Sequence, residues 1–128
     1  AEADDEDAGE ASDDTVDTFT LTGKRGREVE VVPYSDMVWV EAVKNYSRIM
    51  IRGQRPRIIR RTMAEWEASL PAGNFARVSR SLIVQLPAVR SIQWQSRDQT
   101  LLFFEGVPTQ LPLGRTAAAR LKELLRHG

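Results

Sequence analysis

The chain has 128 residues, which is enough for one domain of ordinary size and too few for two. It has no cysteine, and its single histidine, His127, lies next to the end, which excludes disulfides, thiolate metal sites and catalysis by a resident histidine. No apolar run approaches the roughly 18 residues of a membrane span. We therefore expect a cytoplasmic protein that is not an enzyme, has no membrane segment and needs no cofactor or metal.

A formal net charge of zero hides a division along the chain. Residues 1–17 carry nine acids and no base, whereas residues 18–128 carry all 18 bases and the other nine acids. Fifteen of the bases are arginines, whose planar guanidinium suits phosphates and guanine edges. We expect residues 1–17 to be a disordered acidic linker or tail, and residues 18–128 to form one domain with a polyanionic partner.

From Phe19 onward, apolar residues alternate with polar ones, and turn residues interrupt the alternation about every ten residues. Val29 and Val31 alternate with acids in the first such stretch. Similar alternation recurs at residues 38–42, 49–51 and 92–94, and a continuous apolar run follows at 101–104. This pattern predicts an assembly of short antiparallel strands.

Two segments have helical spacing instead. Thr62 and Glu65 are spaced as a capping box, and Met63, Trp66 and Leu70 then lie on one helical face. A second apolar stripe is formed by Ala117, Leu121, Leu124 and Leu125. The predicted fold class is mainly β, with small antiparallel β-sheets packed together with two short helices.

Six arginines flank the turn at residues 53–56, and they could be either the solvated face of a hairpin or part of a polyanion site. They are Arg48, Arg52, Arg55, Arg57, Arg60 and Arg61.

Residues 75–86 contain an arginine in an unexpected phase. If the alternation of Leu82, Val84 and Leu86 is continued backwards, Arg80 falls on the apolar face. A buried unpaired arginine would cost several kcal/mol, so either the strand bulges at residues 79–81 or this face opens onto a surface. A structural salt bridge would need an acid that the segment does not supply. The donors exposed together would be Arg77, Ser79, Arg80 and Ser81.

Two other loops carry polar groups suited to nucleic acid. Lys44, Asn45 and Tyr46 lie between two predicted strands; asparagine can pair with adenine, although it also favours tight turns without any ligand. Arg115 and Thr116 follow Gly114 at the start of the last helix, where Thr116 would be the N-cap and Arg115 would read a base.

Together these residues resemble the LytTR family, the DNA-binding output domains of LytR/AlgR-type bacterial response regulators. The resemblance covers roughly residues 18–126. It rests on Val38-Trp39-Val40-Glu41-Ala42 followed by Asn45-Tyr46, and on Phe75-Ala76-Arg77-Val78-Ser79-Arg80-Ser81-Leu82-Ile83-Val84. Ser79 stands where many members have His, Gln85 where Asn is usual, and Gly114 where Ser is common.

The resemblance implies a sequence-specific domain that reads promoter DNA, at repeated sites, with loops in successive major grooves. The implied contacts fall around Asn45–Tyr46, around Ser79–Ser81 and at Arg115. It also implies a homodimer on DNA and a regulatory domain N-terminal to this segment. Two other classes stay open on the residues alone: an RNA or single-strand binder that stacks bases on a basic β-surface, and a protein-interaction module that captures a partner at a sheet edge.

Overall fold

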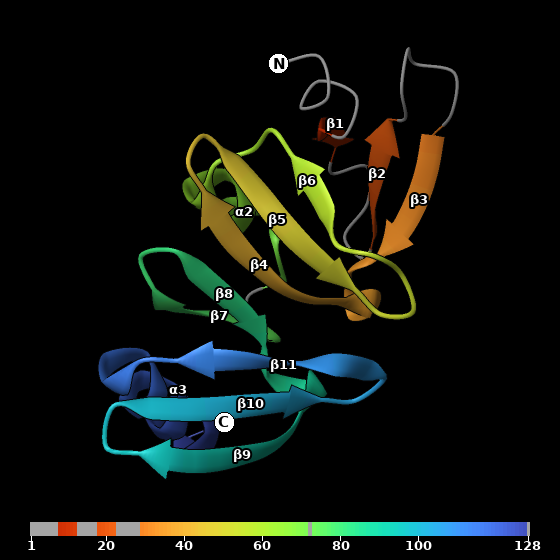
Figure 1. Cartoon of the computed structure of the whole chain (residues 1–128). Coiled ribbons are helices and arrows are strands. Elements are labelled where there is room, and N and C mark those ends of the chain that lie inside the picture. The colour runs from red at the N-terminus through yellow and green to blue at the C-terminus, as the bar shows by residue number, and fades with distance from the viewer. Residues whose placement is uncertain (1–7, 13–17, 23–28, 72, 128) are drawn as a thin grey trace.

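The computed structural model describes residues 8–12, 18–22, 29–71 and 73–127 (Figure 1). The strands are β1 (Ala8–Ser12), β2 (Thr18–Thr22), β3 (Val29–Pro33), β4 (Met37–Val43), β5 (Tyr46–Ile51), β6 (Arg57–Ile59), β7 (Phe75–Ser79), β8 (Leu82–Gln85), β9 (Val89–Ser96), β10 (Gln99–Phe104) and β11 (Val107–Leu113). The helices are α2 (Met63–Ser69) and α3 (Arg115–His127), with short 3-10 turns η2 (Tyr34–Asp36) and η3 (Leu86–Ala88). Neither α2 nor α3, the α-helices of the described ranges, is long and apolar enough to cross a membrane.

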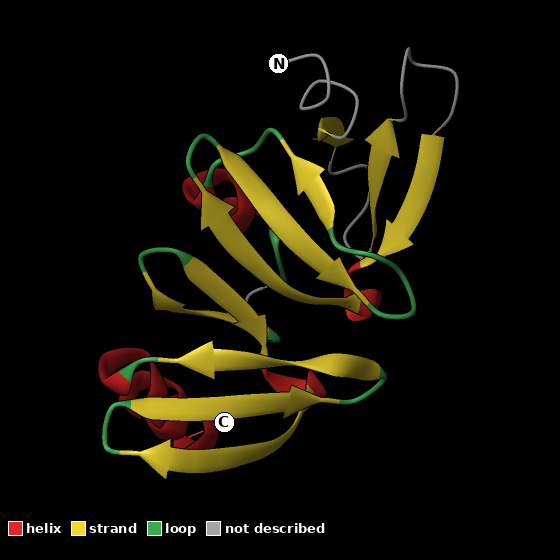
Figure 2. Ribbon diagram, viewed as in Figure 1, coloured by secondary structure: helices red, strands yellow, loops and turns green. Residues whose placement is uncertain are grey.

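The strands form an eight-stranded sheet, in the order β3-β2-β1-β6-β5-β4-β8-β7, and a three-stranded sheet in the order β11-β10-β9. Neighbouring strands are antiparallel except β1 and β6, which pair in parallel, so β1 joins the β2–β3 hairpin to the central strands. Figure 2 shows α2 beside the larger sheet and α3 beside the smaller one. The prediction of a mainly β fold with two short helices is confirmed.

Two apolar cores lie on opposite faces of the central strands. The first packs α2 and the β2–β3 hairpin against one face, and the second packs the three-stranded sheet and α3 against the other. Strand β4 contributes to both, with Val40 in the first core and Trp39 in the second. Strand β4 is covered on both faces, which explains why its sequence is a nearly continuous apolar run.

Two stretches near the N-terminus differ from simple expectation. Val29 and Val31 do share a face, but each is 60% exposed; the buried residue is Val32, which pairs with Phe19 and joins the first core. Strand β1 lies within the segment that we expected to be disordered. The rest of that segment, residues 1–7 and 13–17, is outside the described residues.

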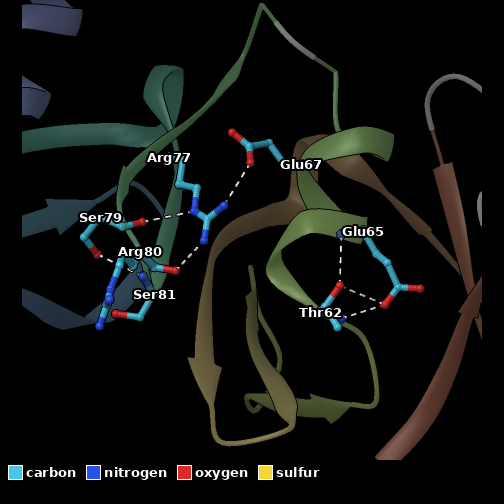
Figure 3. A network of polar contacts seen from close by, with 7 residues as sticks. All are labelled: Thr62, Glu65, Glu67, Arg77, Ser79, Arg80 and Ser81. Atoms are coloured by element: carbon cyan, nitrogen blue, oxygen red, sulfur yellow. Dashed lines mark hydrogen bonds and ion pairs between the residues drawn. The ribbon is translucent and has the colours of Figure 1, made fainter.

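The capping box of α2 is confirmed. The Thr62 hydroxyl accepts from the Glu65 backbone N–H at 3.1 Å, and the Glu65 carboxylate accepts from the Thr62 N–H at 2.8 Å (Figure 3). These reciprocal bonds satisfy the free N–H groups at the start of the helix. They fix the orientation in which Met63 and Trp66 enter the first core.

Candidate nucleic-acid interface

Residues 75–86 do not form one strand, as the alternation suggested, but the hairpin β7–β8. Ser79 pairs with Leu82, so Arg80 and Ser81 form a two-residue turn, and the register shifts between Arg77 and Ser79. The reversal explains why Arg80 has the wrong phase for the apolar face: it lies in the turn and is exposed. The sequence analysis did not predict this turn, because residues 80 and 81 include no glycine, proline or asparagine.

Arg77 holds the β7–β8 turn from inside. Its guanidinium donates to the carbonyl oxygens of Ser79 and Arg80, at 3.2 and 2.6 Å, and pairs with the Glu67 carboxylate of α2 at 3.0 Å. Glu67 is the acid that the segment itself lacks, so the salt-bridge alternative that we considered applies to Arg77. Figure 3 shows the Arg77 guanidinium turned towards α2, and the Arg80 side chain turned away from it.

The β4–β5 hairpin supplies a second turn next to the first. Val43 pairs with Tyr46, and Lys44 and Asn45 form the turn between them, both exposed. It is Lys44 rather than Asn45 that takes a left-handed conformation, with φ of 57°. The Ala42 backbone N–H donates to the Ser81 carbonyl at 2.9 Å, which ties the end of β4 directly to the β7–β8 turn.

Tyr46 is half-buried against the segment that leads into α2. Its hydroxyl accepts from the Arg60 guanidinium at 3.2 Å, and Arg60 also lies 5.5 Å from the centre of its ring. Next to it, the buried Ser47 hydroxyl donates to the Arg61 carbonyl, and the Arg61 guanidinium lies 4.4 Å from the centre of the Trp66 ring. Tyr46 and Arg61 are therefore largely engaged in holding the segment in place.

Arg115 begins α3 and is exposed. The Asp98 carboxylate, in the β9–β10 turn, accepts from both Nε and Nη2 of Arg115, at 3.1 and 2.6 Å. The Ala118 N–H bonds to the Gly114 carbonyl, so Gly114 occupies the N-cap position and Thr116 lies in the first helical turn. The prediction that Thr116 is the N-cap is wrong, because the helix begins directly after β11. Asp98 had no signal beyond lying in a predicted turn.

One groove of about 420 Å³ brings these loops together. It is bounded by the end of β4, by the β7–β8 turn and by the junction between β11 and α3. In Figure 1 the β4–β5 turn, the β7–β8 turn, the start of α3 and the β9–β10 turn follow one another along the left edge of the molecule. We call this row of turns the turn edge; its exposed cations are Lys44, Arg80, Arg97 and Arg115.

The group of six arginines does not stay together. Arg48, Arg60 and Arg61 lie towards the turn edge, whereas the other three lie at or beside the β5–β6 loop at the opposite end of those strands. There the Arg57 guanidinium pairs with the Glu30 carboxylate at 2.8 Å. This hydrogen bond from Arg57 is the main cause that lowers the pKa of Glu30, with Gln54 adding a second one. Arg57 thus has a structural partner away from the turn edge.

The turn edge has the chemistry of a site for a polyanion. Its guanidinium and ammonium groups project from turns of hairpins that are anchored in two cores, so they are exposed but held on rigid supports. Arginine can donate two parallel hydrogen bonds to a guanine edge or a phosphate. Of the predicted contact residues, Lys44, Asn45, Arg80, Ser81, Arg115 and Thr116 are exposed, whereas Tyr46, Arg77 and Ser79 are only partly accessible.

Most of the chain is similar to one family of known proteins. The model of the LytTr DNA-binding domain family matches residues 27–126. Among curated proteins, the chain is 28% identical over 107 residues to the heme-containing CO-sensing transcriptional regulator RcoM 2 of Paraburkholderia xenovorans, covering 84% of this chain and 40% of the relative. It is 31% identical over 100 residues to the CO-responsive transcriptional regulator RcoM of Rhodospirillum rubrum, covering 78% of this chain and 42% of the relative. The chain therefore spans less than half the length of these relatives.

A solved structure has the same fold. It is the LytTr DNA-binding domain of a protein described as a methyl-accepting/DNA response regulator from Bacillus cereus, with a TM-score of 0.70 and 23% identity, covering 85% of this chain and 96% of that one. The family match also agrees with the expectation of a DNA-binding module that is not an enzyme. The matched segment includes the central strands, both helices and every turn of the turn edge. This chain belongs to the LytTr DNA-binding domain family.

Proposed function

We propose that the turn edge is the surface with which this domain reads double-stranded promoter DNA, its turns entering the major groove. The observation that carries the proposal is the groove that joins the β4–β5 hairpin, the β7–β8 turn and the start of α3. Of the predicted contacts, Ser79, Ser81, Arg115 and Thr116 line this groove, whereas Lys44 and Asn45 lie in the turn that follows β4. A duplex that lies along this edge would contact cations from separate turns, and its phosphates would neutralise their charge.

The contacts divide by what holds each side chain. Arg80 and Arg115 project from the edge and are assigned to bases, because the guanidinium matches the O6 and N7 atoms of guanine. Asn45 is assigned to adenine, and Lys44 to a phosphate. Arg77 positions the β7–β8 turn and contacts DNA only at its margin, since its guanidinium already has three partners. Tyr46, Ser79, Ser81 and Thr116 complete the predicted contact set.

The domain is further proposed to act as the output part of a longer cytoplasmic regulator. We infer a homodimer on repeated half-sites and a regulatory domain N-terminal to this segment, linked through the acidic stretch 1–17. The resemblance to response regulators suggests control by a two-component system. The curated relatives are instead named as CO-responsive, so the regulatory domain could equally be a small-molecule sensor.

The experiment compares two exposed arginines at opposite ends of the same sheet. Duplexes selected from a random DNA pool are titrated with the wild type, Arg80→Ala and Arg55→Ala. Arg80→Ala should lose most of the preference for the selected sequence. Arg55→Ala, in the β5–β6 loop, should bind like the wild type. Both variants should melt like the wild type, because both side chains are exposed.

Three outcomes would contradict the proposal. Equal losses in the two variants would mean that binding is not confined to the turn edge. Stronger competition by single strands or RNA than by duplex would favour the base-stacking alternative. Affinity for duplex that stays flat between low and moderate salt would exclude phosphate contacts, since each contact should contribute about −0.9 to the slope of log K against log salt.

A further inference from the structure

One tryptophan lies on the surface although its strand position points inward. Trp39 and Trp66 are 3% and 0% exposed, whereas Trp94 of β9 is 54% exposed. Trp94 pairs with Thr100, so it shares the face of β9 and β10 that carries Ile92 and Leu102 onto the second core. The indole is thus an extension of the core face that nothing in the described chain covers completely.

The residues of α3 opposite Trp94 explain why it stays uncovered. A groove of about 240 Å³ runs between the β9–β10 hairpin and α3, lined by Trp94, Arg97, Arg115, Ala118, Ala119 and Lys122 among others. The two alanines are too short to reach across it. The Lys122 ammonium lies 5.5 Å from the centre of the Trp94 ring, so the two large α3 side chains that line the groove, Arg115 and Lys122, are both cations.

The charge of this groove is strongly one-sided. Arg97, Arg115 and Lys122 are all exposed around it, and the nearby acid Asp98 already pairs with Arg115. Along α3, residues seven and eleven positions after Arg115 lie on the same helical face, and these are Lys122 and Arg126. At 1.5 Å per residue this row of cations is about 16 Å long, which is enough to meet more than one phosphate of a backbone.

We propose that this second groove holds the DNA backbone that flanks the base read by Arg115. The inference rests on the proposed function, and it extends the interface from the turn edge along α3. Arg115 lines both grooves, so they are adjacent. Lys122 and Arg97 would pair with consecutive phosphates, and the Trp94 ring would pack against the deoxyribose between them, with its indole N–H free to donate to a phosphate oxygen.

A nucleic-acid backbone fits this groove better than other occupants. An apolar peptide would bury Arg97 and Lys122 without anionic partners, since the nearby Asp98 already pairs with Arg115. A small free anion would satisfy one cation and leave both the indole and the rest of the row unused. A backbone has anionic groups at regular spacing separated by apolar sugar faces, which is the alternation that the cations and the indole present.

The test uses Trp94 as its own probe. Because the other two tryptophans are buried, acrylamide should quench mainly the emission of Trp94. Saturation with a selected duplex that extends at least six base pairs beyond the Arg115 contact should lower the quenching constant at least two-fold. In Trp94→Phe, both the quenchable emission and its change on binding should be absent. A duplex truncated at the Arg115 contact should bind more weakly and protect Trp94 less.

A matched pair of variants on α3 tests the phosphate contact. Lys122→Ala should weaken binding to all sequences alike and reduce the magnitude of the salt slope by about one. Arg120→Ala removes another exposed cation, from the far side of the same helix, and should leave both quantities unchanged.

Binding to a fluorescently labelled duplex, followed by anisotropy, separates the two proposals. If duplex binds and Trp94 remains as quenchable as in the free protein, or if Lys122→Ala and Arg120→Ala behave alike, the second groove does not hold DNA and the turn edge still can. If no selected duplex binds at all, the proposed function is wrong and this inference falls with it.

Discussion

The exposed guanidinium of Arg115 is oriented before any DNA arrives. Arg115 and Asp98 are 61% and 74% exposed, and ion pairs this exposed contribute only about 0–1 kcal/mol to stability. The value of the contact is positional: Nε and one N–H of Nη2 donate to Asp98, which leaves Nη1 and the second N–H of Nη2 for a base. An arginine held in this way loses less side-chain entropy on binding.

Arg115→Lys should therefore keep most of the nonspecific affinity and lose the preference at one base position. Lysine keeps the charge but not the planar pair of donors, and a bidentate contact discriminates between bases by about 1–3 kcal/mol. The measurement is a binding series over all four bases at each position of a selected site. A Lys variant that weakens every sequence equally would show that Arg115 contacts only a phosphate.

Lys44 combines a strained backbone with an exposed charge, and substitutions can test the effects of the strain and of the charge separately. At φ of 57° a residue with a Cβ is less favourable than glycine by roughly 1–2 kcal/mol. Lys44→Gly should thus fold at least as stably as the wild type while losing one phosphate contact. The expected result is an unchanged or higher melting temperature together with weaker binding of every duplex and a salt slope smaller by about one.

Lys44→Ala serves as the control for this separation, since it removes the charge and keeps the strain. Lys44→Ala should bind DNA as weakly as Lys44→Gly does, but its melting temperature should be lower than that of Lys44→Gly. Equal binding by the wild type and both variants would show that Lys44 is not part of the interface.

At the level of elements, α2 supports the β7–β8 turn, and its own start depends on a carboxylate. Hydrogen bonds from the Thr62 backbone N–H and then from the Thr62 hydroxyl lower the pKa of Glu65. A group whose pKa is lowered by folding adds stability above its unfolded pKa, and this contribution is lost as the pH falls through the folded pKa. The cap should thus be fully effective at neutral pH and weaken in the acid range below the ordinary glutamate pKa.

The prediction is that Glu65→Ala lowers the urea midpoint at pH 7 and has a much smaller effect at pH 3. Urea unfolding of the wild type and the variant at both pH values measures it. Glu65→Gln is the control, because a neutral amide still accepts from the Thr62 N–H and should show no such pH dependence. A difference between wild type and Glu65→Ala that is the same at both pH values would mean that the ionised carboxylate is not what caps α2.

The sequence predicted the elements better than it predicted their partners. Strand alternation, the capping box and the apolar stripe of α3 depend on neighbours within a few residues, so all three could be predicted from the sequence. The turn at Arg80–Ser81 was not, because the Ser79 hydroxyl that accepts from the Ser81 N–H is a weak turn signal, and the Arg77 guanidinium that bonds the turn is itself held by Glu67 of α2. The pairing of Arg115 with Asp98 joins residues 17 apart and depends on the packing of α3 beside the β9–β10 hairpin.

The same limit applies to the charged surface. Six arginines close together in sequence were separated, because Arg60 and Arg61 follow the end of β6 whereas Arg52 and Arg55 lie in the β5–β6 loop at its other end. Conversely, turns far apart in sequence were brought to one edge by the antiparallel order of β4, β5, β7 and β8. A family resemblance could indicate the contact turns, but the second groove around Trp94 followed only from the three-dimensional packing.

Over the whole molecule, the distribution of charge is as important as its sum. Residues 18–128 carry a net charge of +9, and residues 1–17 carry −9. An acidic segment tethered to a basic domain competes with phosphates for the same cations, and the competition weakens as salt screens it, with a Debye length of about 8 Å at 0.15 M. Removing the whole segment would also remove β1, which joins the β2–β3 hairpin to β6.

The cleaner change is to neutralise the eight acids of residues 1–17 that lie outside β1, by replacing Asp with Asn and Glu with Gln. This raises the formal net charge from zero to +8. Nonspecific affinity for duplex should increase most at low salt and approach that of the wild type as salt rises, because the competing interaction is purely electrostatic. The ratio of specific to nonspecific affinity should stay nearly constant or fall, since the base contacts are unaltered. Titrations at several salt concentrations measure both quantities. A matched variant in which the same eight acids are exchanged, Glu for Asp and Asp for Glu, keeps the charge and should bind like the wild type. An affinity that is unchanged at low salt would mean that the acidic segment does not reach the cations of the turn edge.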